Sequence, residues 1–260
     1  MRKYSKKRLK NPLPCCIIKS AKANHIRTGG LKKPMKYKYL LFDADDTLLD
    51  FGRSEHEALT DALMKFGVTP SDELISGYSE INDRLWKLLE RGGIAKDVLR
   101  VKRFELFAEK YGLAVDPWAL AAEYTDRLAE KSYLVDGARE LCSELYGKCR
   151  LFIITNGIKN IQQSRLGASA IKQYIEKSFI SEEVGAEKPS PAYFNYVKNN
   201  IVGFSCREAL VIGDSLTSDI AGGIAAGIDT CWFNPRRREL TGGVCPTYEI
   251  HALAELYGIL

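Results

Sequence analysis

The sequence predicts an α/β protein, in which a doubly wound parallel sheet carries a small α-helical domain as an insertion. Two observations support this prediction. Beyond residue 133, short apolar runs alternate with amphipathic segments, a pattern typical of parallel strands joined by crossover helices. Between residues 54 and 130 the pattern is helical throughout, so this block interrupts the alternation after its first strand.

The first strand is predicted at residues 36–42, a near-continuous apolar run that contains aromatic residues and ends in aspartates. In the helical block, apolar residues recur every three or four positions, and Asp116-Pro117 supplies an N-cap followed by a first-turn proline. Later strands are predicted at 151–155, 209–212 and 229–233, and helices at 138–145, 192–199 and 217–226. We therefore expect a core of residues 35–52 and 134–260, and a helical domain of residues 53–133.

Residues 1–34 differ in charge from the rest of the chain. They hold eleven Lys and Arg residues and no Asp or Glu, and without them the net charge changes from +5 to −6. Three prolines and little apolar periodicity predict a disordered extension that is dispensable for catalysis. Met35 stands directly before the first strand, so a start codon assigned too far upstream would explain the extension. A targeting peptide and a nucleic-acid-binding arm are the competing interpretations.

Composition narrows the classes of protein and of chemistry. No apolar run approaches the roughly 20 residues of a membrane-spanning helix, so we expect no transmembrane segment. The seven cysteines are scattered without a CxxC pair, and the three histidines lack metal-ligand spacing. We therefore expect reduced thiols, a cytoplasmic protein and chemistry that depends on carboxylates.

Polar side chains follow three of the predicted strands. Asp43 and Asp45 come after the first, residues 155–157 (Thr-Asn-Gly) after the second, and Asp214 with Asp219 after a later one. In doubly wound sheets the carboxyl ends of the strands face a common crevice, so these groups can converge there. At an effective dielectric near 20, two carboxylates about 4 Å apart repel by roughly 4 kcal/mol, so such a cluster predicts a bound cation or ligand.

With Glu187-Lys188-Pro189 placed before the last group, this order of motifs resembles the haloacid dehalogenase superfamily over residues 37–233. Asp46 departs from the superfamily's common DxDGT form, which has glycine at that place. An EF-hand loop does not fit the aspartates, because Leu48 and Ser54 stand where it requires glycine and glutamate. Asp45 favours phosphate chemistry over dehalogenation, since the dehalogenase branch typically lacks this second aspartate.

The resemblance implies a Mg²⁺ ion held by Asp43, the backbone carbonyl of Asp45, Asp214 and Asp219. It implies that Asp43 is the nucleophile that forms an aspartyl-phosphate, and that Asp45 acts first as acid and then as base. The residues implied to hold the transferring phosphoryl group are Thr155, Asn156, Gly157 and Lys188.

The helical insertion matches the small cap of this superfamily. The stretches INDRLWKLLERGGI, RFELF and ITNGI, with others, resemble the YjjG-type noncanonical pyrimidine nucleotidases, which implies a nucleoside 5′-monophosphate substrate. Asn82 and Trp86 are four residues apart on one predicted helix face, where an amide can bond a base edge and an indole can stack on it. Arg103 is a third candidate for contact with the nucleotide. The interpretation of Trp86 and Phe104 as cap core stays open.

Two alternatives remain. The same chemistry on a sugar or other small phosphate ester is one. The other, of a different class, is a catalytically degenerate nucleic-acid-binding or regulatory protein, suggested by the basic extension. The acidic remainder of the chain and the intact Asp43, Asp45, Lys188 and Asp214 argue against it. We expect a small-molecule nucleotide substrate, no nucleic acid or membrane partner, and a monomer or small homo-oligomer.

Overall fold

The computed structural model describes residues 19–20, 35–240 and 243–260. The described residues form a seven-stranded, fully parallel sheet. Its strands are β1 (Lys19–Ser20), β2 (Tyr39–Phe42), β3 (Arg150–Thr155), β4 (Lys177–Ile180), β5 (Ala209–Gly213), β6 (Asp229–Phe233) and β7 (Tyr248–Ile250). The strand order is β1-β7-β6-β5-β2-β3-β4, so the first core strand, β2, lies between β5 and β3. The predicted α/β class is confirmed.

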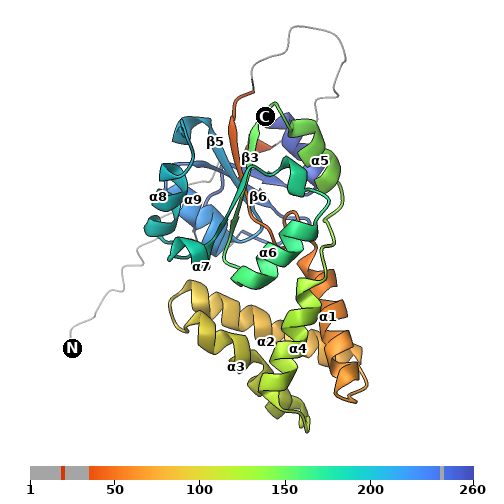
Figure 1. Cartoon of the computed structure of the whole chain (residues 1–260). Coiled ribbons are helices and arrows are strands. Elements are labelled where there is room, and N and C mark those ends of the chain that lie inside the picture. The colour runs from red at the N-terminus through yellow and green to blue at the C-terminus, as the bar shows by residue number, and fades with distance from the viewer. Residues whose placement is uncertain (1–18, 21–34, 241–242) are drawn as a thin grey trace, which may run out of the picture.

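Both faces of the sheet are covered, because successive side chains of each strand point to opposite sides. In β2, Leu40 and Phe42 pack into one apolar cluster, and Tyr39 and Leu41 pack into another. Figure 1 shows α5 on one side of the sheet, with α8 and α9 on the other. The core helices are α5 (Ala138–Leu145), α6 (Lys159–Ala168), α7 (Ser181–Val184), α8 (Pro191–Asn199) and α9 (Ala221–Ala225). Short 3₁₀ turns span Lys172–Tyr174, Cys206–Glu208 and Leu253–Gly258, and a π-helical turn spans Leu216–Ile220.

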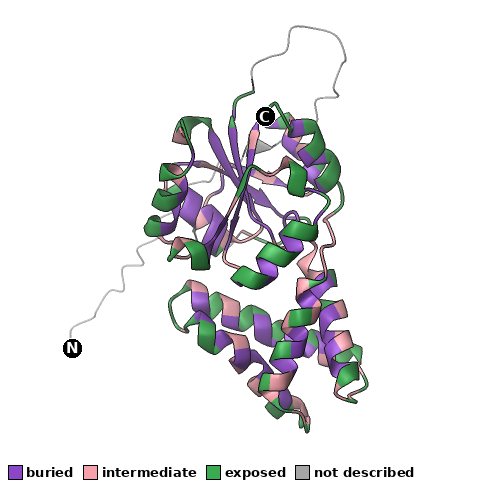
Figure 2. Ribbon diagram, in the orientation of Figure 1, coloured by how far each residue is buried: buried purple, intermediate pink, exposed green. Residues whose placement is uncertain are grey.

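Four helices beyond β2 form a separate unit, which we call the cap. They are α1 (Phe51–Lys65), α2 (Asp72–Glu90), α3 (Lys96–Tyr111) and α4 (Pro117–Ala129). The cap has its own apolar cluster, and its helices turn buried faces inward and exposed faces outward (Figure 2). Ile158 and Ile161 join this cluster from the core side, and α4 packs against α6. Helix α6 is therefore the platform on which the cap rests.

The chain enters and leaves the cap through two segments that lie side by side. The amide of Asp50 donates to the carbonyl of Tyr133 at 3.0 Å, and the amide of Val135 donates to the carbonyl of Leu48 at 3.0 Å. These bonds hold both segments at the carboxyl edge of the sheet, next to the loop that follows β2. Both chain connections to the cap thus lie at one place, directly beside the aspartate cluster.

Two core strands were not predicted from the sequence. β4 and β7 are only four and three residues long, and each carries partly exposed positions, so neither gives the continuous apolar signal of a buried parallel strand. Lys19 and Ser20 pair with Tyr248 and Glu249 at the sheet edge, although they belong to the stretch expected to be disordered. The rest of residues 1–34 lies outside the described residues.

No helix in the described ranges is long and apolar enough to cross a membrane. In the part of the chain that the structure describes, four cysteines are free thiols, namely Cys142, Cys149, Cys206 and Cys231. Cys245 is disulfide-bonded, so the expectation of reduced thiols does not hold at that position.

Candidate active site

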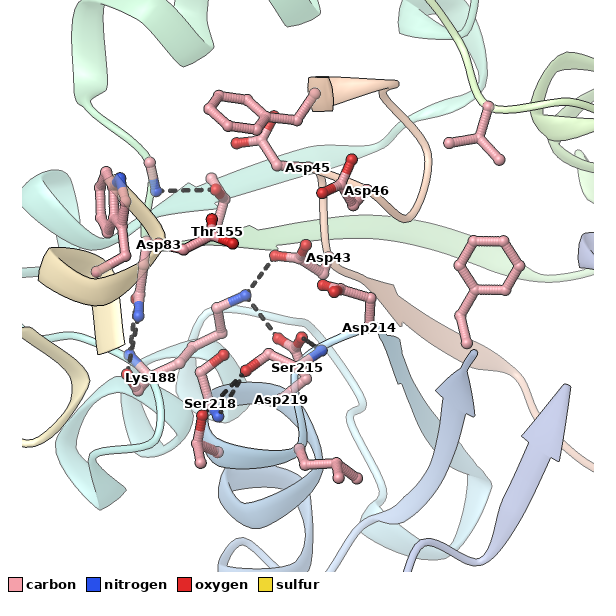
Figure 3. A pocket seen from close by; sticks show the side chains of 18 of the residues that line it. Asp43, Asp45, Asp46, Asp83, Thr155, Lys188, Asp214, Ser215, Ser218 and Asp219 are labelled. Carbon is pink, nitrogen blue, oxygen red and sulfur yellow. Dashed lines mark hydrogen bonds and ion pairs between the residues drawn. The ribbon is translucent and has the colours of Figure 1, made fainter. Parts of the chain in front are cut away.

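A cavity of about 1010 Å³ lies between the carboxyl edge of the sheet and the cap. Figure 3 shows aspartates from several loops turned toward one another in it. Every predicted site residue lines this cavity: Asp43, Asp45, Asn82, Trp86, Arg103, Thr155, Asn156, Gly157, Lys188, Asp214 and Asp219. The topology therefore brings together groups that are up to 176 positions apart in the chain, from Asp43 to Asp219.

A buried lysine joins two of the carboxylates. Lys188 Nζ lies 2.5 Å from Asp43 Oδ1 and 2.7 Å from Asp219 Oδ1 (Figure 3). It also donates to the carbonyl of Ile154 at 2.9 Å. The exposed fractions are 7% for Asp43, 2% for Lys188 and 0% for Asp219. Charges this deeply buried require mutual partners, so these three side chains form one ionic unit.

The backbone around Lys188 is fixed by Asn156. Asn156 Nδ2 donates to the carbonyl of Lys188 at 2.8 Å, and the amide of Lys188 donates to Asn156 Oδ1 at 2.8 Å. The Asn156 side chain therefore positions the lysine instead of pointing a free amide into the cavity. On its outer side, the Asn156 carbonyl accepts from Lys96 Nζ of α3 at 2.8 Å, which ties the cap to this loop.

Asp219 reaches the site from the π-helical turn Leu216–Ile220. The amide of Ser215 donates to Asp219 Oδ2 at 3.1 Å, so this carboxylate also satisfies the loop that follows β5. A Cβ atom added at Gly213 would lie 2.3 Å from Asp219 Oδ2. Gly213 at the end of β5 therefore leaves the room that Asp219 occupies, and π-turns of this kind often occur at functional sites.

The pKa values show an excess of negative charge. Burial raises the pKa of Asp43; Lys188 lowers it, while Asp219 and Asp214 raise it, and the result lies well above the usual value. Burial also raises the pKa of Asp214 to about 8, with further increases from Asp219 and Asp46. Burial alone would lower the pKa of Lys188, but Asp219 and Asp43 raise it above its ordinary value, so the lysine stays charged.

The donor set fits a divalent cation. Oxygen atoms of Asp43, Asp214 and Asp219 all lie within 4.8 Å of one another. When all three are ionised they carry three negative charges against the one buried positive charge of Lys188. The two remaining charges match a hard divalent ion such as Mg²⁺, which prefers carboxylate oxygen ligands. Arg238, whose side chain is about half exposed, lies 3.2 Å from Asp214 Oδ2 at the cavity rim.

Thr155 ends β3 with its hydroxyl in the cavity wall. Its Oγ1 accepts from the amide of Gly157 at 3.0 Å and from Gln162 Nε2 at 3.1 Å. These two bonds use the acceptor capacity of the oxygen, so the hydroxyl hydrogen is available to donate. The Gly157 amide, predicted to bond the phosphoryl group, bonds Thr155 instead.

Asp45 is held at both of its carboxylate oxygens. Arg165 Nη1 lies 2.5 Å from Oδ1, and Gln162 Nε2 lies 2.5 Å from Oδ2. The neighbouring Asp46 has φ of 55°, in the left-handed region that favours glycine, and its Oδ1 accepts from the amide of Gly52 at 3.2 Å. This conformation explains why the DxDGT form has glycine there and why aspartate, which tolerates the region, can replace it.

The cap side of the cavity carries a second polar cluster. Glu55 Oε1 accepts from Asn82 Nδ2 at 2.8 Å and Glu55 Oε2 accepts from Ser79 Oγ at 2.5 Å, while Asn82 Oδ1 accepts from Arg103 Nη1 at 3.0 Å. Asn82 and Arg103 are each 1% exposed, and both bond inside the cap, but Arg103 Nη2 is buried without a hydrogen-bond partner among the described residues. Trp86 is partly buried against the cap cluster and also lines the cavity.

The sequence did not single out Gln162, Arg165 or Lys96, and it indicated no role for Gly213. The first two follow the Thr-Asn-Gly turn on α6, three positions apart, so the helical period puts them on one face of a helix that begins at the carboxyl edge. That three-residue spacing was the sequence signal from which Gln162 and Arg165 could have been found. Nothing in the sequence connects Lys96 with its partners 60 to 91 positions later in the chain.

The comparisons with known proteins agree with this geometry. Residues 37–227 match the family model of the haloacid dehalogenase-like hydrolases. The chain is 40% identical to pyrimidine 5′-nucleotidase PynA of Streptococcus pneumoniae, over 87% of this chain and 96% of that protein. It is 35% identical to pyrimidine 5′-nucleotidase YjjG of Escherichia coli, over 87% of this chain and 99% of that protein.

A solved structure gives the same result for the fold. The HAD-hydrolase YfnB of Bacillus subtilis, in a crystal form bound to magnesium, superposes with a TM-score of 0.83 at 40% identity, covering 86% of this chain and 98% of that chain. The expected resemblance is thereby confirmed. A family model matches most of the chain, the relatives are of nearly equal length, and the fold and the order of the strand-end motifs are shared. The chain therefore belongs to the haloacid dehalogenase-like hydrolases.

Proposed function

We propose that the protein is a Mg²⁺-dependent phosphomonoesterase that hydrolyses pyrimidine nucleoside 5′-monophosphates through an aspartyl-phosphate on Asp43. One observation carries the chemistry. The buried carboxylate of Asp43 forms an ion pair with Lys188 and faces the cavity, with two further carboxylates beside it. A second acid, Asp45, stands two residues later in the chain and is held in a fixed position. The protein is expected to act in the cytoplasm, as the sequence predicts.

In the first step, a carboxylate oxygen of Asp43 attacks phosphorus, and the bond from phosphorus to the leaving oxygen breaks. Asp45, in its acid form, gives its proton to that oxygen, so the leaving group departs as an alcohol. Lys188 and the Thr155 hydroxyl donate to the phosphoryl oxygens, where negative charge develops. When bound by Asp43, Asp214 and Asp219, Mg²⁺ supplies charge screening that lets a carboxylate approach an anionic phosphate.

In the second step, water attacks the phosphorus of the aspartyl-phosphate. Asp45, now a carboxylate, takes a proton from this water, and the bond between phosphorus and Asp43 breaks to release inorganic phosphate. Both side chains return to their starting forms. The two aspartates can hold different roles because Asp43 is buried in an ion pair with Lys188, whereas Asp45 is partly exposed to the cavity.

The substrate class is supported from two sides. The names of PynA and YjjG describe pyrimidine 5′-nucleotidases, and both relatives match the present chain along nearly their whole length. The cavity also extends to a cap wall with an indole, an amide and a guanidinium, from Trp86, Asn82 and Arg103. Such a wall suits a flat, polar base better than a compact sugar phosphate.

The experiment is phosphate release by the full chain from a panel of nucleoside monophosphates, sugar phosphates and p-nitrophenyl phosphate, with Mg²⁺ and with a chelator. We expect the highest kcat/KM for pyrimidine nucleotides and loss of turnover with the chelator. A higher kcat/KM for a sugar phosphate would favour the alternative substrate class. Turnover that persists without a divalent ion would contradict the proposed cofactor.

A further inference from the structure

We propose that Gln162 and Arg165 are positioning residues that hold the carboxyl group of Asp45 in the orientation needed for proton transfer to the leaving group. This inference rests on the proposed role of Asp45 and extends it to two residues that the sequence did not single out. Both lie on α6, one helical turn apart, on the platform beneath the cap.

The two residues hold different oxygens of the same carboxylate. Arg165 bonds Oδ1 and Gln162 bonds Oδ2, each at 2.5 Å. A rotation of the Asp45 carboxyl group about its Cβ–Cγ bond would break both contacts together. Without them the group would be free to turn, because the Asp45 side chain is 28% exposed and faces an open cavity.

Arg165 is itself rigidly held. Its side chain is 1% exposed, its Nε donates to the carbonyl of Lys131 at 2.8 Å, and its Nη2 lies 3.4 Å from Ser54 Oγ. Ser54 and Lys131 belong to the two ends of the cap, where the chain enters and leaves it. The guanidinium therefore links the orientation of Asp45 to the base of the cap.

Gln162 is fixed from the other side. Its Nε2 also donates to Thr155 Oγ1 at 3.1 Å, so the same amide nitrogen joins Asp45 to the end of β3. An ionised carboxylate only accepts hydrogen bonds, so the amide must present its nitrogen here. A Cβ atom at Gly157 would lie 2.1 Å from Gln162 Nε2, and any larger residue there would displace the amide.

The competing interpretation is a structural ion pair, in which Asp45 merely neutralises a buried arginine. The two interpretations differ in what they predict for the leaving group. A mispositioned acid slows the reaction most when the leaving oxygen is strongly basic and needs a proton, whereas a structural defect slows all substrates alike. A displacement of about 1 Å at a reacting group can cost on the order of a hundredfold in rate.

The test measures kcat/KM for p-nitrophenyl phosphate and phenyl phosphate, which have similar size but different leaving groups. Gln162→Met keeps the side-chain length and removes the donor, and Arg165→Lys keeps the charge and removes the forked geometry. Gln163→Ala is the matched control, since this neighbouring glutamine on the same helix points outward to Glu183. Circular dichroism and the thermal midpoint verify that each variant folds.

We expect Gln162→Met to lower kcat/KM at least about tenfold more for phenyl phosphate than for p-nitrophenyl phosphate, with Gln163→Ala within about twofold of wild type for both. Gly157→Ala should show the same leaving-group dependence, because it displaces the same amide. Equal losses for both esters in folded Gln162→Met would overturn the proposal, even if Arg165→Lys failed to fold. A wild type that hydrolyses both aryl esters but no nucleotide would contradict the proposed substrate class and leave this comparison valid.

Discussion

The core and the cap each bury a polar cluster against the same cavity, but the two clusters differ in charge. The core cluster holds three carboxylates, Asp43, Asp214 and Asp219, around one buried lysine. The cap cluster holds one carboxyl group and one guanidinium, Glu55 and Arg103, joined through the amide of Asn82. The core cluster is thus strongly unbalanced, whereas the cap cluster contains equal numbers of acidic and basic groups.

This difference in charge indicates that the core cluster serves the reaction, whereas the cap cluster supports the structure of the cavity wall. A buried excess of negative charge costs free energy unless a cation or an anionic substrate with its metal offsets it, so it is maintained where a reaction needs it. A balanced cluster can satisfy itself with hydrogen bonds and mainly fixes the shape of a wall. We expect substitutions in the core cluster to abolish the reaction, and substitutions in the cap cluster to change stability and substrate preference.

The largest effect is expected from Asp43→Asn. An amide cannot form the acyl phosphate, so turnover should fall by at least about a thousandfold while the protein stays folded. The measurement is steady-state phosphate release with Mg²⁺, together with the thermal midpoint. Asn82→Asp, which changes the charge of the cap cluster, is the variant with which Asp43→Asn in the core cluster is compared. If Asp43→Asn retained more than about a thousandth of wild-type turnover, with contamination excluded, the covalent mechanism would be wrong.

A second prediction concerns Glu55 and the pH dependence of stability. Burial raises the pKa of Glu55 from 4.5 to about 7, against the opposing effect of its bond from Ser79. The native state therefore holds a proton that the unfolded chain releases near pH 4.5, so this stabilisation is complete below pH 4.5 and lost as pH rises through about 7. The shift corresponds to roughly 3 kcal/mol of unfolding free energy.

The measurement is urea unfolding of wild type and Glu55→Gln between pH 4 and 8. We expect wild type to lose stability relative to Glu55→Gln as pH rises through this range. Glu57→Gln is the control, because bonds from Tyr133 and Arg53 lower the pKa of Glu57 in spite of a small opposing effect of burial, and stability from such a group is instead lost as pH falls. Parallel pH profiles for wild type and Glu55→Gln would show that Glu55 does not titrate in the cap.

The sequence predicted the central strands and the cluster at their ends because both depend on local signals. β2, β3 and β5 are buried apolar runs, and the parallel arrangement requires their carboxyl ends to share one edge. Asp43 and Asp214 follow two of these strands directly, so their meeting could be predicted without knowing any side-chain direction. Edge strands such as β4 lack this signal, because one side of the strand is partly exposed.

Contacts that depend on the direction in which a side chain points could not be predicted from the sequence in the same way. Arg165 meets Asp45 across 120 positions, and the contact depends on the angle at which α6 leaves β3. Asn82 lines the cavity, but its bonds to Glu55 and Arg103 depend on how three cap helices pack together. Charge pairs of this kind follow from tertiary geometry, whereas strand-end residues follow from topology.

A third prediction is that Mg²⁺ stabilises the core cluster and has no such effect through the cap. A ligand at about a hundred times its Kd adds about 2.7 kcal/mol to the unfolding free energy of the state that binds it. We expect the thermal midpoint of wild type to rise with Mg²⁺ and that of Asp214→Asn to rise far less. Asp83→Asn is the matched control, since this carboxylate lines the same cavity from α2 and lies outside the cluster. Equal shifts in wild type and Asp214→Asn would place the ion elsewhere.

The smallest effect is expected at the cap wall, where Trp86 lies partly buried and lines the cavity. If the indole contacts the base, Trp86→Ala should lower kcat/KM for a pyrimidine nucleotide by about fivefold, since one aromatic contact contributes on the order of 1 kcal/mol. p-Nitrophenyl phosphate has no base to reach this wall, so its kcat/KM should stay within about twofold. Trp118→Ala, a truncation of a 67% exposed indole on α4, controls for the loss of an aromatic residue from the cap. Parallel losses on both substrates would assign Trp86 to cap packing, and the contrast between a reactive core cluster and a selective cap would then depend on Asn82 and Arg103 alone.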